Sequence, residues 1–90
     1  ELLNVVFFNR KRQMIKIKKE DFKTILTLED ARQKVFSIEQ QITEVITLLR
    51  STPYANDCSD IDQLRAINFY LRETRRETGE VIMKIISRNN

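Results

Sequence analysis

The chain has 90 residues, of which 41% are hydrophobic and 32% are charged, and its formal net charge is +3. These proportions are typical of one small globular domain and exclude a disordered chain. The sequence has no histidine and a single glycine, so it lacks the usual general base at neutral pH and cannot form a glycine-rich phosphate loop. We therefore expect a non-enzymatic protein with no catalytic residues, no cofactor, no metal and no small-molecule substrate.

The cysteine content and the apolar segments indicate where the protein works. Cys58 is the only cysteine and cannot form a disulfide within the chain, which favours a reducing, intracellular (cytoplasmic) setting. The apolar run at residues 2–8 is too short to span a membrane. Cations follow this run, which is the reverse of their order in a signal peptide. We expect no membrane partner.

The first predicted element is a β-ribbon with strands at about residues 2–8 and 14–18. The first segment is rich in strand-forming residues, and the second alternates isoleucine with lysine, as a strand with one buried face does. Residues 20–28, which follow the ribbon, fit either the start of a helix or a third strand. In the ribbon we expect Ile15 and Ile17 to pack against the rest of the protein. We expect Lys16 and Lys18, on the other face, to point into solvent.

A first long helix is predicted over about residues 28–51. Thr27 and Asp30 have the spacing of a capping box, which would satisfy free amides of the first turn. The helix should end before Pro53, because proline disfavours helical geometry in the residue before it. Apolar residues recur at alternating steps of three and four, which predicts a heptad seam. Its members are Leu28, Ala31, Val35, Ile38, Ile42, Val45 and Leu49.

A second helix is predicted over about residues 60–88, with a similar capping box from Ser59 to Asp62. The segment that separates the two helices, residues 51–59, is long enough for the second helix to fold back on the first. We therefore predict a long antiparallel helical hairpin. The predicted seam of this helix is Leu64, Ile67, Leu71, Thr74, Thr78, Val81 and Ile85.

The predicted fold class is mainly α, in one domain of residues 1–90. The basic ribbon arm (1–26) would pack on the helical hairpin (27–90), where Phe36, Ile82 and Ile86 would bury its apolar face. A two-helix seam leaves several apolar side chains without cover, which predicts completion by dimerisation into a four-helix bundle. The candidate interface residues are Phe36, Ile46, Leu48, Phe69, Ile82 and Ile86.

The excess positive charge lies on the arm, which has seven Lys/Arg and three Asp/Glu, against nine and ten in the rest of the chain. Such a ribbon could follow a nucleic-acid backbone, or its lysines could be solvated surface that protects a strand edge. A second basic stripe surrounds Phe69, where arginines could hold a phosphate or an acidic partner or could merely cover the ring. The candidate contacts are Arg10, Lys11, Arg12, Lys16, Lys18, Arg65, Arg72 and Arg76.

Residues 72–80 form a weak segment of the second predicted helix. Thr74 and Thr78 occupy seam positions, and Gly79 costs about 1 kcal/mol relative to alanine in a helix interior. Neighbouring charges attract and repel each other to a similar extent. Two interpretations stay open: a soft, solvated stretch, or a site that binds a partner or sets the helix register.

Two functional hypotheses follow from these patterns. The first is an interaction or assembly module whose paired amphipathic helices bind a second copy of the chain and another protein. The alternative is a small nucleic-acid-binding protein that uses the basic ribbon. The absence of catalytic chemistry and the two heptad helices favour the first hypothesis.

Overall fold

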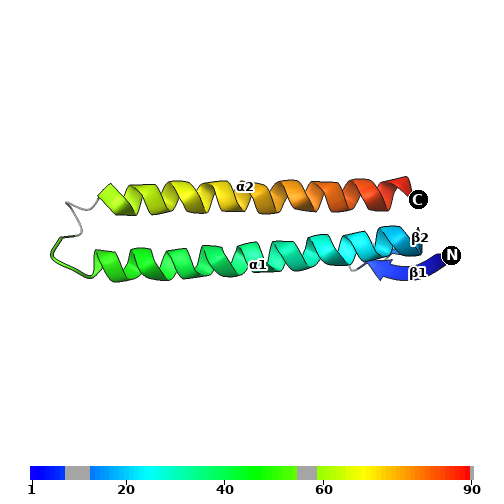
Figure 1. Cartoon of the computed structure of the whole chain (residues 1–90), viewed down its shortest axis with the longest axis horizontal. Helices are drawn as coiled ribbons and strands as arrows, with labels where there is room; N and C mark the ends of the chain where they lie inside the picture. Colours follow the sequence, from blue (N-terminus) through cyan, green and yellow to red (C-terminus); the bar gives the residue numbers. More distant parts are fainter. Residues whose placement is uncertain (8–12, 55–58, 90) are drawn as a thin grey trace.

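The computed structural model describes residues 1–7, 13–54 and 59–89. It is a rod of 59 × 18 × 16 Å in which two helices run side by side in opposite directions, with a two-stranded ribbon at one end (Figure 1). The predicted fold class, a helical hairpin with an N-terminal ribbon, is confirmed. The elements are β1 (Leu2–Phe7), β2 (Gln13–Lys18), α1 (Lys19–Arg50) and α2 (Ser59–Arg88).

Helix α1 begins earlier than predicted, directly after β2. The predicted cap at Thr27 is wrong, because the Thr27 hydroxyl donates a hydrogen bond to the carbonyl of Lys23 inside the helix, at 3.1 Å. The ambiguous segment is therefore helical rather than a third strand. Glu20 and Asp21 lie in the first turn, where their negative charge favours the positive end of the helix dipole.

The seam between the helices also differs from the prediction. Leu28, Val35, Ile42 and Leu49 do lie in it, but at alternate positions the seam is displaced by one residue toward the C-terminus in both helices. Ile38 and Val45 are consequently 46% and 44% exposed. The buried and half-buried seam residues are Ile25, Leu28, Arg32, Val35, Glu39, Ile42, Ile46 and Leu49 of α1, and Ile61, Leu64, Asn68, Leu71, Arg75, Thr78, Ile82 and Ile85 of α2.

The displaced seam has a physical cause at its two ends. It aligns isoleucines there, at Ile25 and Ile82 beside the ribbon and at Ile46 and Ile61 toward the other end, and all four are buried. Burying such side chains contributes roughly 1.5–3 kcal/mol each. The cost is that polar residues occupy the seam between these ends.

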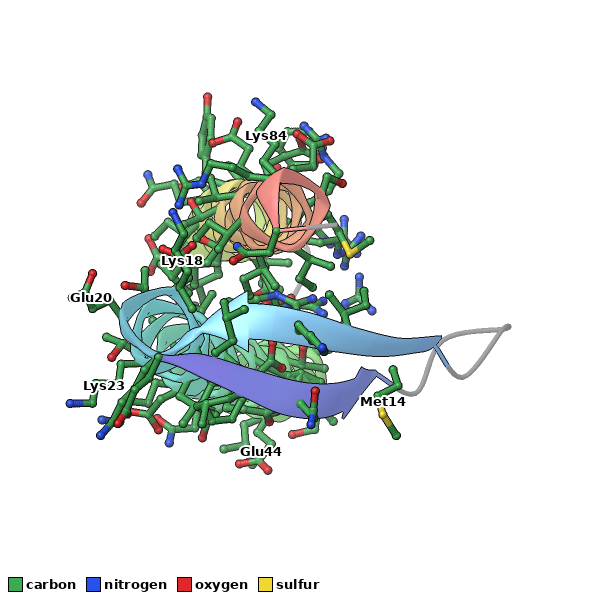
Figure 2. The ribbon with its side chains drawn as sticks, turned by 90° about the vertical axis from the view of Figure 1, so that its right-hand side faces the viewer. Met14, Lys18, Glu20, Lys23, Glu44 and Lys84 are labelled. Carbon is green, nitrogen blue, oxygen red and sulfur yellow. The ribbon has the colours of Figure 1, made fainter. Side chains whose placement is uncertain are left out.

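The ribbon packs its isoleucines on the helices, as predicted. In the antiparallel register Leu3 pairs with Ile17 and Val5 with Ile15 on the inner face. Met14, on the outer face, points away from the helices (Figure 2). Phe36 was expected to contribute here but lies outside the core cluster. That cluster consists of Ile15, Ile17, Ile25, Ile82, Ile85 and Ile86, with Val5, Phe22 and Leu28 packed against it.

Hydrogen bonds join the end of α2 to the ribbon and to the start of α1. The Asn89 side chain accepts from the backbone amide of Lys18 at 3.1 Å and donates to Asp21 at 2.8 Å. Arg88 donates to the other Asp21 oxygen at 3.1 Å. The pKa of Asp21 lies below its usual value, first because Asn89 donates to its charged form and then because of the nearby cations Arg88 and Lys18.

Among the described residues, no helix has the length and apolar character needed to cross a membrane.

Candidate functional site

The middle of the hairpin is held by an ion pair between a buried carboxylate and a half-buried arginine. Glu39 is only 6% exposed, and it accepts hydrogen bonds from Arg75 Nε at 2.8 Å and Nη2 at 3.3 Å. The Arg75 guanidinium also lies 5.0 Å from the centre of the Phe36 ring, within cation–π range. The hydrogen bond to Glu39 raises the pKa of Arg75 above its usual value.

Arg32 extends this polar cluster along the seam. Its Nη1 donates to Glu29 at 2.8 Å and its Nε donates to the backbone carbonyl of Arg75 at 3.2 Å. The guanidinium lies beside Gly79, but a Cβ placed on that glycine would meet it at 3.5 Å, which is ordinary contact. An alanine would therefore fit at position 79. Arg32 of α1 contacts the predicted weak segment of α2 through its hydrogen bond to the Arg75 carbonyl.

Asn68 is a second polar group in the seam. Its side-chain amide donates to the Thr43 hydroxyl at 3.2 Å, while its buried Oδ1 has no hydrogen-bond partner among the described residues. A buried polar atom without a partner costs about 1–3 kcal/mol. Polar seam residues of this kind weaken a helix pair but specify its register.

These contacts define the register of the hairpin and show which residues share a side. Glu39 contacts Arg75 across the seam, and Thr43, beside the seam, contacts Asn68. In this antiparallel pair the residues that directly precede the seam positions lie on the same side of both helices. We name this side the bare flank. Its exposed aliphatic, aromatic and small residues are Ala31, Ile38, Val45 and Leu48 of α1 and Ile67, Tyr70, Thr74 and Val81 of α2, and exposed polar residues, among them Lys34, Gln41, Gln63, Glu77 and Lys84, lie on the same side.

The bare flank is apolar along the middle of the rod. Its aliphatic and aromatic side chains are between 44% and 70% exposed, and no described residue covers them. Beyond Ala31, they are Ile38, Val45, Leu48, Ile67, Tyr70 and Val81. Exposed apolar side chains that gather on one side in this way mark an interaction surface more often than isolated exposed residues do.

The opposite side, which we name the ribbon flank, is different. Near one end it carries the ribbon, which packs against Phe22 and Ile86 and reaches out to one side of the helix pair (Figure 2). Further along, Phe36, Arg65 and Arg72 lie there. The two long sides of the hairpin therefore differ: the ribbon covers part of one side, whereas the other is uncovered and exposes several apolar side chains.

The predicted basic contacts do not form one site. Arg10, Lys11 and Arg12 lie outside the described residues. Lys16 and Lys18 are exposed on the outer face of the ribbon. The remaining candidates, Arg65, Arg72 and Arg76, lie along α2.

Much of the stripe around Phe69 is paired with acidic residues. Arg65 lies 3.9 Å from Asp62, and Arg76 pairs with Glu73 at 3.0 Å and with Glu80. The hydrogen bond to Glu73 is the main reason that the pKa of Arg76 is raised. Arg72 forms no ion pair with a described residue. Phe69 is 56% exposed and makes an edge contact with Tyr70 at 5.9 Å between ring centres.

The predicted interface residues separate into two groups. Ile46, Ile82 and Ile86 are 7–8% exposed, because the seam and the ribbon already cover them, so they are not available to a partner. Phe36, Leu48 and Phe69 remain exposed, but only Leu48 belongs to the bare flank.

Sequence reasoning missed most of the bare flank because it assigned those residues to the seam. Ile38, Val45, Ile67 and Val81 fit a heptad pattern as well as the true seam does. The signal that distinguishes the two patterns lies at the helix ends. Ile25 and Ile46 of α1, and Ile61 and Ile82 of α2, belong to the true seam and not to the predicted one.

Within residues 1–7, 13–54 and 59–89, no group of three or more acidic or cysteine side chains is placed to hold a metal ion. The chain matches no protein-family model, no curated protein and no solved structure.

Proposed function

We propose that the protein is a non-enzymatic interaction module whose bare flank binds a helical segment of a protein partner. The observation that supports this proposal is an inversion along the middle of the rod. Arg32, Glu39 and Arg75 occupy the seam, while aliphatic residues such as Ile38 and Val45 are exposed on the flank. Apolar surface on the outside and charge on the inside is unfavourable for an isolated hairpin.

The shape of the bare flank favours a helix as the ligand. Its residues come from two parallel ridges, one on each helix, and an amphipathic helix fits along such a pair of ridges. Each half-exposed Ile or Val that a partner covers would contribute on the order of 1 kcal/mol. Several such contacts together give the weak-to-moderate affinity that is common in assembly modules.

Site-specific photo-crosslinking tests this proposal. A photoreactive amino acid is placed at Val45 or Ile67 on the bare flank, and in control proteins at Gln33 or Glu73 on other faces. We expect the two flank positions to form covalent adducts with the partner protein. These adducts should disappear when Ile38→Glu is added, because a charge in the middle of the stripe would be buried on binding.

The matched control for the added charge is Ser37→Glu, which alters the neighbouring exposed position outside the flank. Adducts from the flank positions should survive this change. Equal labelling from all four positions, or adducts that persist with Ile38→Glu, would contradict the proposal.

Nucleic-acid binding by the ribbon is a second candidate, supported by one observation. Lys16 and Lys18 are exposed on the same outer face, where they pair across the ribbon with Asn4 and Leu2. Binding of duplex and single-stranded DNA and RNA, titrated at several salt concentrations, tests it. Lys16→Ala/Lys18→Ala should weaken binding and flatten its salt dependence, whereas Lys84→Ala on α2 should not. No binding at low salt would remove this candidate.

A further inference from the structure

We infer that the occupant of the bare flank is a second copy of this chain, joined through a two-fold axis parallel to the rod. This inference deepens the proposed function and rests on it. In the resulting four-helix arrangement, α1 of one copy runs antiparallel to α2 of the partner copy. Both ribbons lie at the same end, on the outer sides of the bundle.

The apolar residues of the bare flank match themselves under this rotation. Within one hairpin, Ile38 lies at nearly the level of Thr74 and Val45 at that of Ile67, as the Glu39–Arg75 and Thr43–Asn68 contacts require. The rotation keeps these levels and exchanges the helices. Val45 of one copy therefore meets Ile67 of the partner copy, and Ile38 meets its Thr74. A large side chain at one level faces a small or similar one, which suits close packing.

Charge on the border of the flank selects this arrangement. Lys34 lies one turn from Ala31 and Ile38, and Glu77 lies one turn from Thr74 and Val81. The two residues are at almost the same level of the rod, one on each helix. The proposed rotation brings Lys34 of each copy beside Glu77 of the other, so the dimer gains two ion pairs.

The alternative rotation, about an axis across the rod, makes α1 face α1 and α2 face α2. It would place Lys34 near Val45 of the partner copy and Glu77 near the Ile67 end of its α2. Neither charge would then face an opposite charge, and both would lose water against apolar groups. Lys34 already pairs with Asp30 at 3.1 Å, but this contact is largely exposed and contributes little. Glu77 forms no ion pair with a described residue.

The size of the bare flank permits a small dimer interface. The rod is 18 Å wide, and the flank extends over residues 31–48 of α1, about 26 Å at a rise of 1.5 Å per residue. Contact over this length would bury on the order of 500 Å² per copy, which is at the lower limit for a specific interface. The ribbon does not obstruct this contact, because it packs against Phe22 and Ile86 on the other side of the hairpin.

Charge reversal followed by mixing tests the arrangement. Lys34→Glu and Glu77→Lys are purified separately, and their masses in solution are measured by sedimentation equilibrium. The unchanged chain should dimerise at micromolar concentrations. Each variant alone should dimerise about tenfold more weakly, because both cross-pairs become like-charged. Mixing the two variants should restore dimerisation, because a mixed dimer again contains two opposite-charge pairs.

Native mass spectrometry then identifies the species in the mixture. We expect mainly the mixed dimer. Lys23→Glu, which changes an exposed lysine away from the flank, should leave dimerisation unchanged, and circular dichroism should show that every variant is equally helical.

Each remaining outcome would overturn the inference. A monomer throughout, even at millimolar concentration, would exclude a second copy. Dimerisation that does not respond to mixing would exclude this axis. In both cases, flank-specific photo-adducts with a different protein would still support the proposed function, so failure of the inference is distinguishable from failure of the function.

Discussion

The ribbon end of the rod and its middle are built from different residues. At the ribbon end, six isoleucines from β2 and both helices bury one another. In the middle, Arg32, Glu39, Asn68 and Arg75 alternate with Val35, Ile42 and Leu71 in the seam, and further aliphatic residues lie exposed on the bare flank. One end of the molecule therefore supplies most of the apolar burial within the chain. The middle instead sets the register through polar contacts and leaves apolar side chains exposed.

The largest expected effect is at the ribbon end. Ile17 is fully buried, at 0% exposure, and Ile17→Ala should lower the free energy of unfolding by about 2–5 kcal/mol because it leaves a cavity. Urea denaturation measures the change. Met14→Ala, in the same strand but 69% exposed, is the matched control and should change stability by less than about 0.5 kcal/mol. Equal effects of the two substitutions would show that the ribbon is not packed on the helices.

A smaller effect is expected in the middle of the rod. Glu39→Ala would leave the Arg75 guanidinium without its acceptor, and we expect a loss of about 1–3 kcal/mol. Glu44→Ala, which removes an exposed carboxylate one turn further along, controls for the loss of charge. Adding Arg75→Ala to Glu39→Ala should cost less than the sum of the single changes, because the two residues act as a pair. Strict additivity in denaturation experiments would contradict the ion pair.

The weak segment of α2 should tolerate, and benefit from, one added methyl group. Gly79→Ala should raise the free energy of unfolding by about 0.5–1 kcal/mol, because alanine favours the helix and its Cβ would only touch Arg32 at ordinary distance. Thermal denaturation measures the gain. A loss of stability would mean that Arg32 packs more tightly on α2 than the 3.5 Å contact indicates.

The smallest effect concerns pH at the ribbon end. The pKa of Asp21 is lower in the folded protein than its ordinary value of 3.8, so its ionised form stabilises the fold above that value and this contribution is lost as pH falls through the lowered pKa. The unchanged chain should melt at a higher temperature than Asp21→Asn at pH 7. The difference should shrink below about pH 4. A difference that stays constant between pH 7 and pH 2 would exclude this role for the carboxylate.

The helical hairpin and the ribbon were predictable because local patterns encode them. The alternation of isoleucine and lysine in β2 and the three–four spacing in both helices were sufficient. The start of α1 was missed because Thr27 and Asp30 resemble a cap, although Phe22 and Ile25 already continue the helical spacing.

The bare flank was not predictable from local patterns. Ile38 and Glu39 compete for the same place in the seam, and hydrophobicity alone favours Ile38. Contacts between distant residues decide the outcome: Glu39 binds Arg75, 36 residues away, and the ribbon draws Ile82 and Ile86 inward. Such long-range pairing does not appear in the periodicity of one helix.

Disulfide trapping between two copies tests whether their bare flanks face each other. Ile38→Cys and Thr74→Cys are prepared as separate proteins, each also carrying Cys58→Ser, and are mixed under mild oxidation. Rapid formation of the mixed disulfide dimer is the predicted result, because bare flanks that face each other would bring these two positions within bridging distance. A mixture that stays monomeric, or that links no faster than a Ser37→Cys and Glu73→Cys control pair, would contradict the account.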